Sequence, residues 1–497
     1  MALAPFFERI YGAIGRHLSV SRESLTATLS DITVGIRCGT DLSPNDVWIA
    51  ELSANLLARL YPRIAFSGPE RLCSSLRDLV LKINPSIAFT YEAPSTATIC
   101  VGFADADGAL FPSATGWVAQ LHHSRQVKAG PSNPYAAAAA ATLACSELFR
   151  RVFQKSRFER DTSLSLLDFS GETGANLELP ARNIGEVLFA GVGGVGNAAI
   201  WALRRHAGLT GKFWFVDHED LTLLNLQRYL LGTYSDVSVS KVELARRAFQ
   251  TTKLTTEIYR VTLEEFAETR GGIDIPTICV SVDNKDSRRS AQALLPRVVI
   301  NGWTGDSSLG ASWHVFSRDA ACLACLYHPH GPGLSSTEQA AIALGLPSVR
   351  AADLWVSSLG LAAEDIRSAA HALGVEEAEL MSWRGRPLAE FYTQVVCGGV
   401  PLNIAGIRRV EVVPLAHQSA LAGVLMASEL VKRTIPELAK PSQPESLVSW
   451  DNVLQPPPSL WRKPRAREAR CICGDPDYQT AYRKKWGAGL KRVAIVA

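Results

Sequence analysis

Before residue 326, short apolar runs alternate with segments long enough for helices. The runs at residues 97–103 and 116–121 predict buried strands. Asn133 and Pro134 predict the start of a helix over residues 135–152, because Asn is a good N-cap and Pro is favoured at the first helical position. We therefore predict that residues 1–165 form a mixed α/β domain.

The alternation becomes more regular after residue 185. Strands are predicted at residues 186–190, 212–216, 276–282 and 297–300, with a helix at 197–206. Strands that alternate with helices are typical of a parallel sheet covered on both faces. Polar side chains follow several of these strands, where parallel sheets bind ligands. Residues 166–325 are therefore expected to hold a ligand site.

Residues 326–400 lack this alternation and predict a helical insertion, with helices at 362–373 and 376–381. From residue 401 the strand-like and helical signals return, including a long helix near residues 415–433. We expect residues 401–497 to complete the preceding α/β domain and to end in a basic tail.

Charge is distributed unevenly along the 497 residues. The whole chain has 51 Lys and Arg against 48 Asp and Glu. Residues 461–497 hold 10 of the basic and 3 of the acidic residues, so the remainder is 41 minus 45, or −4. A nucleic-acid-binding chain would spread its positive charge more widely, so we expect no nucleic-acid partner. The tail is either a solvated surface or a docking site for an acidic partner.

No apolar run approaches the roughly 18 residues that cross a membrane. Glu8 and Arg9 follow Phe7 directly, so no signal-peptide apolar segment forms. We expect a cytoplasmic protein with no membrane association.

The segment GVGGVG at residues 191–196 lies between a predicted strand and a predicted helix. Its glycines, Gly191, Gly193, Gly194 and Gly196, let a phosphate approach the backbone N–H groups of the helix start. Asp217 follows the next strand and could accept hydrogen bonds from ribose hydroxyls. These features alone fit an ordinary dinucleotide fold.

Further polar residues make the prediction more specific. Asn225, Arg228 and Lys241 follow Asp217, and Asp283 ends a later strand. Cleavage of a nucleoside triphosphate needs cations near the phosphates, whereas hydride transfer does not. Asp283 offers oxygen ligands to Mg²⁺. Alternatively, Arg228 pairs with a surface carboxylate and Lys241 is a solvated helix residue.

This set of residues resembles the ThiF/E1 superfamily, the ubiquitin-activating-type enzymes, over residues 183–330 and 397–475. The resemblance implies a Rossmann-like adenylation domain in residues 166–325 in which the matching residues bind ATP and Mg²⁺. It also implies activation of the C-terminal carboxylate of a ubiquitin-like protein as an acyl-adenylate.

Residues 1–165 resemble the inactive adenylation-like half of some members, through GFADADG, GWVAQL and NPYAAAAAATLACSELF. Two such folds in one chain would form a pseudo-dimer, and a homodimer is the other arrangement to expect. The alternative for this region is an unrelated substrate-docking domain.

Two close cysteine pairs, Cys322 with Cys325 and Cys471 with Cys473, predict a structural Zn²⁺ site. The second pair is CxC, where the family usually has CxxC. His328 and His330 lie near the first pair as less favoured ligands. The other candidate cysteines, Cys38, Cys73, Cys100, Cys145 and Cys279, lack any such partner pattern.

Cys397 lies in VVCGGVP, where Gly398 and Gly399 would leave its sulfur accessible. In E1-like enzymes a catalytic cysteine lies at the matching place. A thiolate attacks an acyl-adenylate readily and forms a reactive thioester. The alternative is a buried structural thiol. Together with Arg228 and Lys241, Cys397 completes the predicted catalytic set.

The prediction for the whole chain is therefore an E1-like enzyme that activates a ubiquitin-like protein and passes it to an E2-like partner. It most resembles the bacterial E1-like proteins of ubiquitin-like conjugation operons, including antiphage systems. The alternatives are a sulfur-carrier-protein adenylyltransferase of thiamine or molybdopterin synthesis, and a scaffold with the fold but no chemistry.

Overall fold

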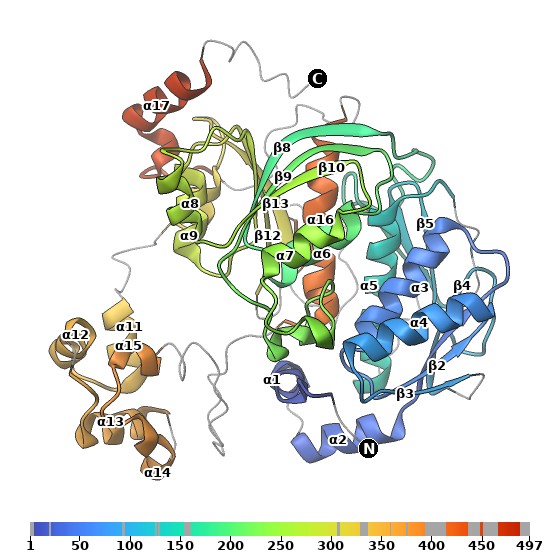
Figure 1. Cartoon of the computed structure of the whole chain (residues 1–497), viewed down its shortest axis with the longest axis horizontal. Coiled ribbons are helices and arrows are strands. Elements are labelled where there is room, and N and C mark those ends of the chain that lie inside the picture. Colours follow the sequence, from blue (N-terminus) through green and yellow to red (C-terminus); the bar gives the residue numbers. More distant parts are fainter. Residues whose placement is uncertain are drawn as a thin grey trace. The chain divides into compact units, whose positions relative to one another are not determined.

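The computed structural model in Figure 1 describes most of the chain. The described residues are 4–18, 21–91, 95–124, 127, 130–153, 161–305, 309–328, 336–357, 359–373, 376–392, 414–435, 448–450 and 466–487. They belong to two compact units, Met1–His328 with Pro414–Ala497, and Pro329–Val413.

The first unit begins with two helices, α1 (Phe7–Leu18) and α2 (Arg22–Asp31), followed by a parallel four-stranded sheet. The sheet has the order β3-β2-β1-β4. Its elements are β1 (Val34–Cys38), α3 (Pro44–Leu57), β2 (Arg63–Ser67), α4 (Glu70–Ile83), β3 (Ala88–Tyr91) and β4 (Ala97–Val101). The strand predicted at 97–103 ends at Val101, because Gly102 takes a φ of +66° that extended backbone does not allow.

A small antiparallel sheet and one long helix complete the N-terminal region. The sheet contains β5 (Phe111–Thr115), β6 (Val118–His122) and β7 (Thr162–Ser165). The helix α5 (Pro134–Phe153) confirms the helix predicted from Asn133 and Pro134. Its alanine run, Ala136–Ala141, is fully buried, and α5 packs against both α3 and α16 (Ala416–Lys432). The small side chains permit this close packing of helices.

A second sheet of seven strands has the order β10-β9-β8-β11-β12-β13-β14. The strands are β8 (Arg182–Ala190), β9 (Leu209–Val216), β10 (Leu254–Tyr259), β11 (Thr277–Val280), β12 (Val298–Thr304), β13 (Leu309–Val315) and β14 (Val448–Trp450). The first five strands in the sheet order are parallel, and β13 and β14 are antiparallel additions at one edge. The mostly parallel sheet predicted from the sequence is confirmed.

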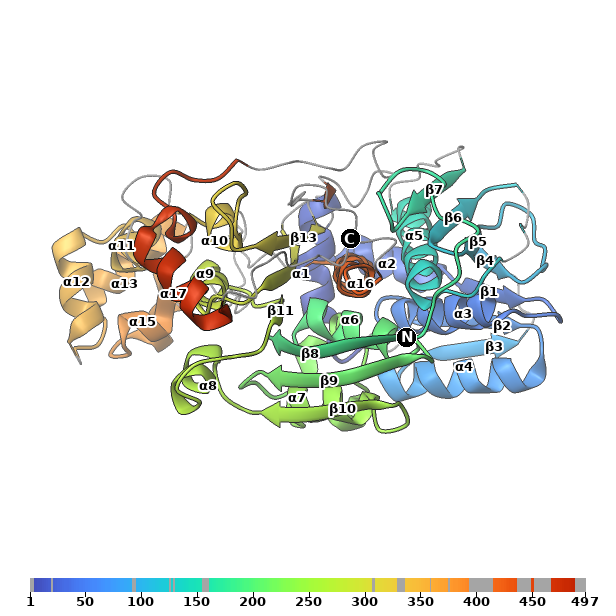
Figure 2. The same cartoon turned by 90° about the horizontal axis from the view of Figure 1, so that it is seen from above.

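Alternate residues of this sheet face opposite helical layers. Leu188 and Val216 pack toward α8 (Leu263–Thr269) and α9 (Lys285–Ala293). On the opposite face, Phe213 and Phe215 contact the ring of Phe249, at the end of α7 (Lys241–Ala248). The helices α6 (Gly194–Leu203) and α16 also contact each other, and α16 contacts β12 and β13. Figure 2 looks along α16, with α5 beside it.

The two parallel sheets share one topology. The order β3-β2-β1-β4 of the N-terminal sheet repeats the order β10-β9-β8-β11 of the second sheet. This repeat is what two related α/β domains in one chain would produce. The inactive adenylation-like character of residues 1–165 stays a prediction.

The second unit is helical in its described parts and has its own hydrophobic core. Leu354, Ile366 and Phe391 are among the buried residues of this core. The helices are α11 (Ser336–Leu344), α12 (Ser348–Val356), α13 (Ala363–Leu373), α14 (Glu377–Leu380) and α15 (Leu388–Phe391). The helices predicted at 362–373 and 376–381 correspond to α13 and α14. Among the described helices of either unit, none has the length and apolarity to cross a membrane.

Candidate functional site

The central strand β8 lies at the point where the sheet topology reverses. The chain continues from β8 to β9 and β10 on one side and then crosses to β11 and β12 on the other side. Ligands bind open parallel sheets at such a point, outside the carboxyl ends of the strands. Residues 191–196, Asp217 and Asp283 follow β8, β9 and β11, respectively, so all three groups lie at this edge.

The glycines of the loop after β8 have separate roles. Gly191 has a φ of +86°, which favours glycine. A Cβ on Gly196 would lie 2.6 Å from the Gly191 carbonyl oxygen and from Ser281 Oγ, so only glycine fits. A Cβ on Gly193 would have no described heavy atom within 4 Å, so this side of the loop is open.

The start of α6 is suited to bind an anion. Gly193 is its N-cap and supplies no side chain to cap the first N–H groups. Those groups carry the positive end of the helix dipole and point toward the open side of the loop. The backbone of this helix start can therefore bind a phosphate group.

Asp217 is fixed beside this loop. Its Oδ2 accepts a hydrogen bond from the Val192 N–H at 2.7 Å, and Oδ1 accepts one from the Glu219 N–H at 2.9 Å. Burial raises the pKa of Asp217, whereas the nearby Lys241 charge opposes this rise. Each carboxylate oxygen keeps a lone pair that could accept a hydrogen bond from a sugar hydroxyl.

Lys241 is the first residue of α7 and is only 4% exposed. Its Nζ donates to a carboxylate oxygen of Glu219, and its backbone N–H donates to the Glu219 carbonyl at 3.0 Å. Burial disfavours the ionised form of Glu219, but the charges of Lys241, His218 and Arg9 keep its pKa below the usual range. Sequence reasoning missed Glu219 and Arg9. Only Glu219, two residues after Asp217, gave a local signal.

Arg228 lies directly over the glycine loop. It ends a short 3-10 helix, Leu223–Gln227, and a Cβ on Gly194 would lie 2.9 Å from Arg228 Nε. The same helix carries Asn225, whose Oδ1 accepts a hydrogen bond from the Thr222 N–H at 3.1 Å. The structure therefore brings Arg228 to the loop and gives Asn225 a capping contact.

Asp283 is exposed, three residues after the end of β11, and the next residue, Asn284, is the N-cap of α9. Below this turn lies the buried Arg288, whose Nη1 donates to the Gly302 carbonyl at 3.1 Å. Burial lowers the pKa of Arg288, and the charges of Tyr327 and Asp283 oppose this. An exposed carboxylate at the edge of the site can take a hydrated Mg²⁺.

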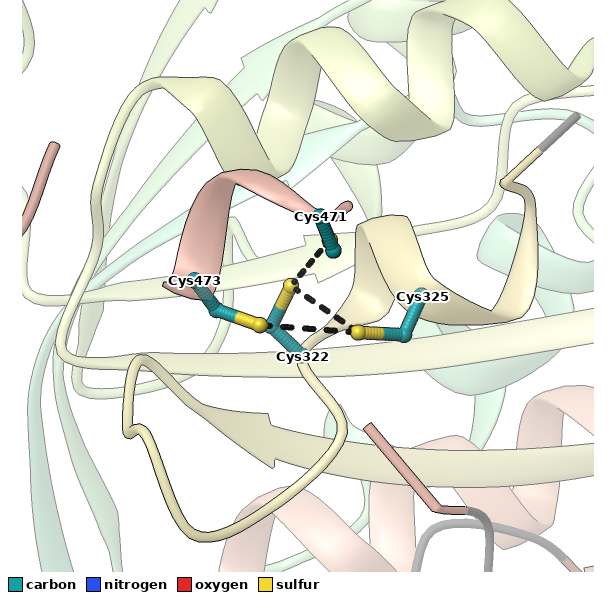
Figure 3. Close-up of side chains that lie close together, drawn as sticks. All are labelled: Cys322, Cys325, Cys471 and Cys473. Atoms are coloured by element: carbon teal, nitrogen blue, oxygen red, sulfur yellow. Dashed lines mark hydrogen bonds between the residues drawn. The ribbon is translucent and has the colours of Figure 1, made fainter. Parts of the chain in front are cut away.

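Four cysteines form a second, separate cluster, shown in Figure 3. Cys322 is the N-cap of the short helix α10 (Leu323–Leu326) and Cys325 lies within it, while Cys471 and Cys473 come from the C-terminal segment. Cys322 Sγ lies 3.5 Å from Cys471 Sγ, and Cys325 Sγ lies 3.5 Å from Cys473 Sγ.

All four sulfurs of this cluster lie within 4.8 Å of one another and are buried. Tetrahedral Zn²⁺ with Zn–S bonds of about 2.3 Å places its sulfurs roughly 3.8 Å apart. The cluster fits such an ion, and the CxC spacing of the second pair does not prevent the sulfurs from converging.

Four other described cysteines are poor nucleophiles. Burial raises the pKa of Cys38, Cys100 and Cys145 to about 12, and that of Cys279 further above the usual range. These thiols stay protonated at neutral pH, and the thiolate is the nucleophilic form. Cys397 and His330 lie outside the described residues.

The chain belongs to the ThiF family, whose sequence pattern matches residues 167–474. It is 33% identical over 469 residues to the protein y4jF of Sinorhizobium fredii (strain NBRC 101917 / NGR234). The matched region covers 90% of this chain and 89% of y4jF. The expected membership of the ThiF/E1 superfamily, with its Rossmann-like fold, is confirmed.

Among solved structures, this chain is similar to the microcin C7 biosynthetic enzyme MccB in complex with N-formylated MccA, at 14% identity and a TM-score of 0.37. That similarity covers 59% of this chain and 67% of the MccB chain. Escherichia coli MccB with ATP is similar at 17% identity and a TM-score of 0.24. In that case the similarity covers 27% of this chain and 42% of MccB.

Proposed function

We propose that this protein uses ATP to adenylate the C-terminal carboxylate of a ubiquitin-like protein. The observation that carries the proposal is Arg228 lying over an uncapped phosphate loop, with Lys241 and Asp217 at the same sheet edge. A cation over the loop suits a reaction in which negative charge builds on phosphate oxygens.

In this proposal the N–H groups of the loop and Arg228 bind the triphosphate, while Asp217 and Asn225 bind the ribose. Asp283 would hold Mg²⁺, which neutralises charge on the phosphates when bound. The carboxylate oxygen attacks the α-phosphorus, and the bond to the bridging oxygen of pyrophosphate breaks. The carboxylate is already the nucleophile, so the residues act by positioning and charge stabilisation. Lys241 stabilises the phosphate charge when its ammonium group leaves the Glu219 carboxylate and pairs with a phosphate oxygen.

A second step moves the activated tail to Cys397. The thiolate attacks the acyl carbon, a thioester forms and AMP leaves with the bonding electron pair. An E2-like partner then accepts the tail on its own cysteine. We place this reaction in a bacterial ubiquitin-like conjugation pathway of the antiphage type, on the strength of the family resemblance. Cys322, Cys325, Cys471 and Cys473 would hold a structural Zn²⁺ with no open position for chemistry.

Pyrophosphate exchange tests the first step. With ATP, Mg²⁺ and a ubiquitin-like protein that ends in a free glycine carboxylate, the wild type should exchange labelled pyrophosphate into ATP. Asp283→Asn should reduce this rate by about 100-fold, because the site loses a charge that orients the metal on the phosphates.

The matched control for this experiment is Asp286→Asn. Asp286 is exposed, lies one turn away and pairs with Arg289 at 3.1 Å. It should retain the wild-type exchange rate. Equal rates for both variants would refute the role of Asp283, and absence of exchange in the wild type would refute the proposed function.

A further inference from the structure

Two side chains of the N-terminal region donate hydrogen bonds to the loop that carries Arg228. Asn55 Nδ2, on α3, donates to the Leu230 carbonyl at 3.1 Å. Arg59, just beyond the end of α3, donates through Nη2 to the Gly232 carbonyl at 3.3 Å and through Nη1 to the Leu226 carbonyl. Two side chains of one helix end thus bind three carbonyls of residues 226–232.

Arg59 is unusual for a buried cation. It is 1% exposed, and its Nε donates to Asn55 Oδ1 at 3.0 Å. Within the described residues it contacts neutral acceptors and no carboxylate. Burial accordingly lowers its pKa to about 9.

A buried charge without an acidic partner is costly, and an apolar side chain of similar volume would avoid that cost. What an apolar side chain lacks is the planar fork of N–H donors that binds several carbonyls at once. The arrangement therefore favours a role in fixing the backbone of residues 226–232.

The same loop is tied to the phosphate loop from the other side. Asn197 Nδ2 donates to the carbonyls of Gly193 at 2.6 Å and Gly194 at 2.9 Å, and its Oδ1 accepts from the Leu231 N–H at 3.4 Å. A shift of residues 226–232 would therefore move Arg228 relative to the glycines that it covers.

We propose that Arg59 and Asn55 are positioning residues of the nucleotide site, through which the N-terminal domain sets the place of Arg228 over the phosphate loop. This inference rests on the proposed function. It assigns to residues 1–165 a part in nucleotide binding that is exerted through Arg228, beyond any role in docking a partner.

Three variants of the full-length protein test this inference. Arg59→Met removes the donors and keeps an unbranched, apolar side chain, whereas Arg59→Lys keeps a charge and a donor. Asn55→Ala is a milder change if Arg59→Met does not fold. We expect Arg59→Met and Asn55→Ala to weaken the binding of Mg²⁺-ATP, measured by calorimetry, by about 10-fold, because a misplaced cation loses its contact with the phosphates. Arg59→Lys should restore part of this loss.

A second measurement separates positioning from general stability. Amide hydrogen exchange of residues 222–232 should accelerate in Arg59→Met and Asn55→Ala without nucleotide and slow again when ATP is added. Glu51→Gln is the matched control, because Glu51 lies on the same helix and pairs with Arg205, just after α6, at 2.7 Å. It should leave both ATP affinity and this exchange unchanged, whatever it does to the melting temperature.

The outcomes distinguish the two proposals. If the wild type binds ATP and both variants bind it equally well with unchanged exchange at residues 222–232, the role of Arg59 and Asn55 is refuted alone. If Glu51→Gln weakens ATP binding as much as Arg59→Met and Asn55→Ala do, any lost contact of α3 with the rest of the unit has this effect, and the inference also fails. If the wild type binds no ATP, the proposed function fails.

Discussion

Lys241 and Glu219 illustrate how single residues of the site depend on partners that the sequence does not mark. Lys241 was expected to face phosphates, and in this structure its ammonium group contacts the Glu219 carboxylate. Arg9, from the first helix of the chain, adds positive charge near the same carboxylate. These contacts join residues that lie far apart in sequence, so no local spacing could predict them.

His206 gives a prediction at the scale of one residue. It is buried, with Nδ1 at 3.1 Å from Tyr135 Oη and Nε2 at 3.0 Å from the Pro180 carbonyl. The carbonyl can only accept, so Nε2 carries the proton and Nδ1 accepts from the tyrosine hydroxyl. Burial lowers the pKa of His206, whereas the Pro180 carbonyl opposes this. The neutral imidazole is therefore the form that fits the folded protein.

The lowered pKa of His206 predicts how the stability of the fold depends on pH. The unfolded chain takes up a proton near the ordinary histidine pKa of about 6.5, while the folded protein does so only at lower pH. Neutral His206 therefore makes its full contribution to stability above the pKa of the unfolded chain. That contribution is lost as the pH falls through the lower pKa of the folded protein. Urea unfolding should show a smaller fall in stability from pH 7 to pH 5 for His206→Gln than for the wild type. The exposed His218→Gln controls for loss of one histidine, and equal slopes for all three proteins would contradict the prediction.

At the scale of elements, the C-terminal helix α17 (Pro476–Trp486) depends on the cysteine cluster and on a few polar contacts. Trp486 Nε1 donates to the Leu295 carbonyl at 2.7 Å, and Lys485 Nζ donates to the Leu294 carbonyl at 2.7 Å. Phe316 and Tyr482 pack with the four cysteines in one buried cluster. The polar contacts of Lys485 and Trp486 lie at the end of α17, so the cysteine cluster is what fixes its start.

Metal removal tests this dependence. We expect about one equivalent of Zn²⁺ in the purified protein, and Cys473→Ser should lower it strongly, because three thiolates bind Zn²⁺ less tightly than four. Residues 466–487 should then exchange their amide hydrogens faster. Cys73→Ala, a buried cysteine on α4 outside the cluster, should keep both the metal and the slow exchange. A fully folded wild type without zinc would contradict the assignment.

At the scale of the whole molecule, the predicted chemistry is divided between the two units. The phosphate loop, Asp217, Arg228 and Asp283 belong to the unit Met1–His328 with Pro414–Ala497, whereas Cys397, outside the described residues, falls in the sequence range Pro329–Val413. Separate cores support the two units, so a change at Cys397 should leave the nucleotide site intact.

Cys397→Ala should therefore form the acyl-adenylate at the wild-type rate and form no thioester. On a non-reducing gel with ATP and the ubiquitin-like protein, the wild type should show an adduct that a thiol reductant removes, and the variant should show none. Cys279→Ala should keep the adduct, because that buried thiol stays protonated. An adduct in Cys397→Ala would place the nucleophile elsewhere. A wild type that forms only the adenylate would favour the sulfur-carrier alternative.

The sequence alone predicted β8, β9, β11 and β12, four strands of the seven-stranded sheet, and the residues with chemical potential, whereas β10 and β13 were not predicted. Apolar runs ending in polar side chains predicted β11 and the buried ends of β8 and β9, since the buried part of a parallel strand is mostly apolar and the sheet edge is where polar groups can face a ligand. The glycines of 191–196 and the two cysteine pairs were equally visible, because backbone freedom and thiol ligands are properties of residue type.

Only the tertiary structure decided which distant groups meet. The convergence of Cys322 and Cys325 with Cys471 and Cys473 could be guessed from chemistry, but their separation of under 4.8 Å is set by packing. The contact of Arg59 with residues 226–232 had no signal at all, because a buried arginine that binds backbone carbonyls leaves no pattern in the sequence. Hydrogen bonds to the main chain are independent of residue type at the acceptor, so the fold alone selects them.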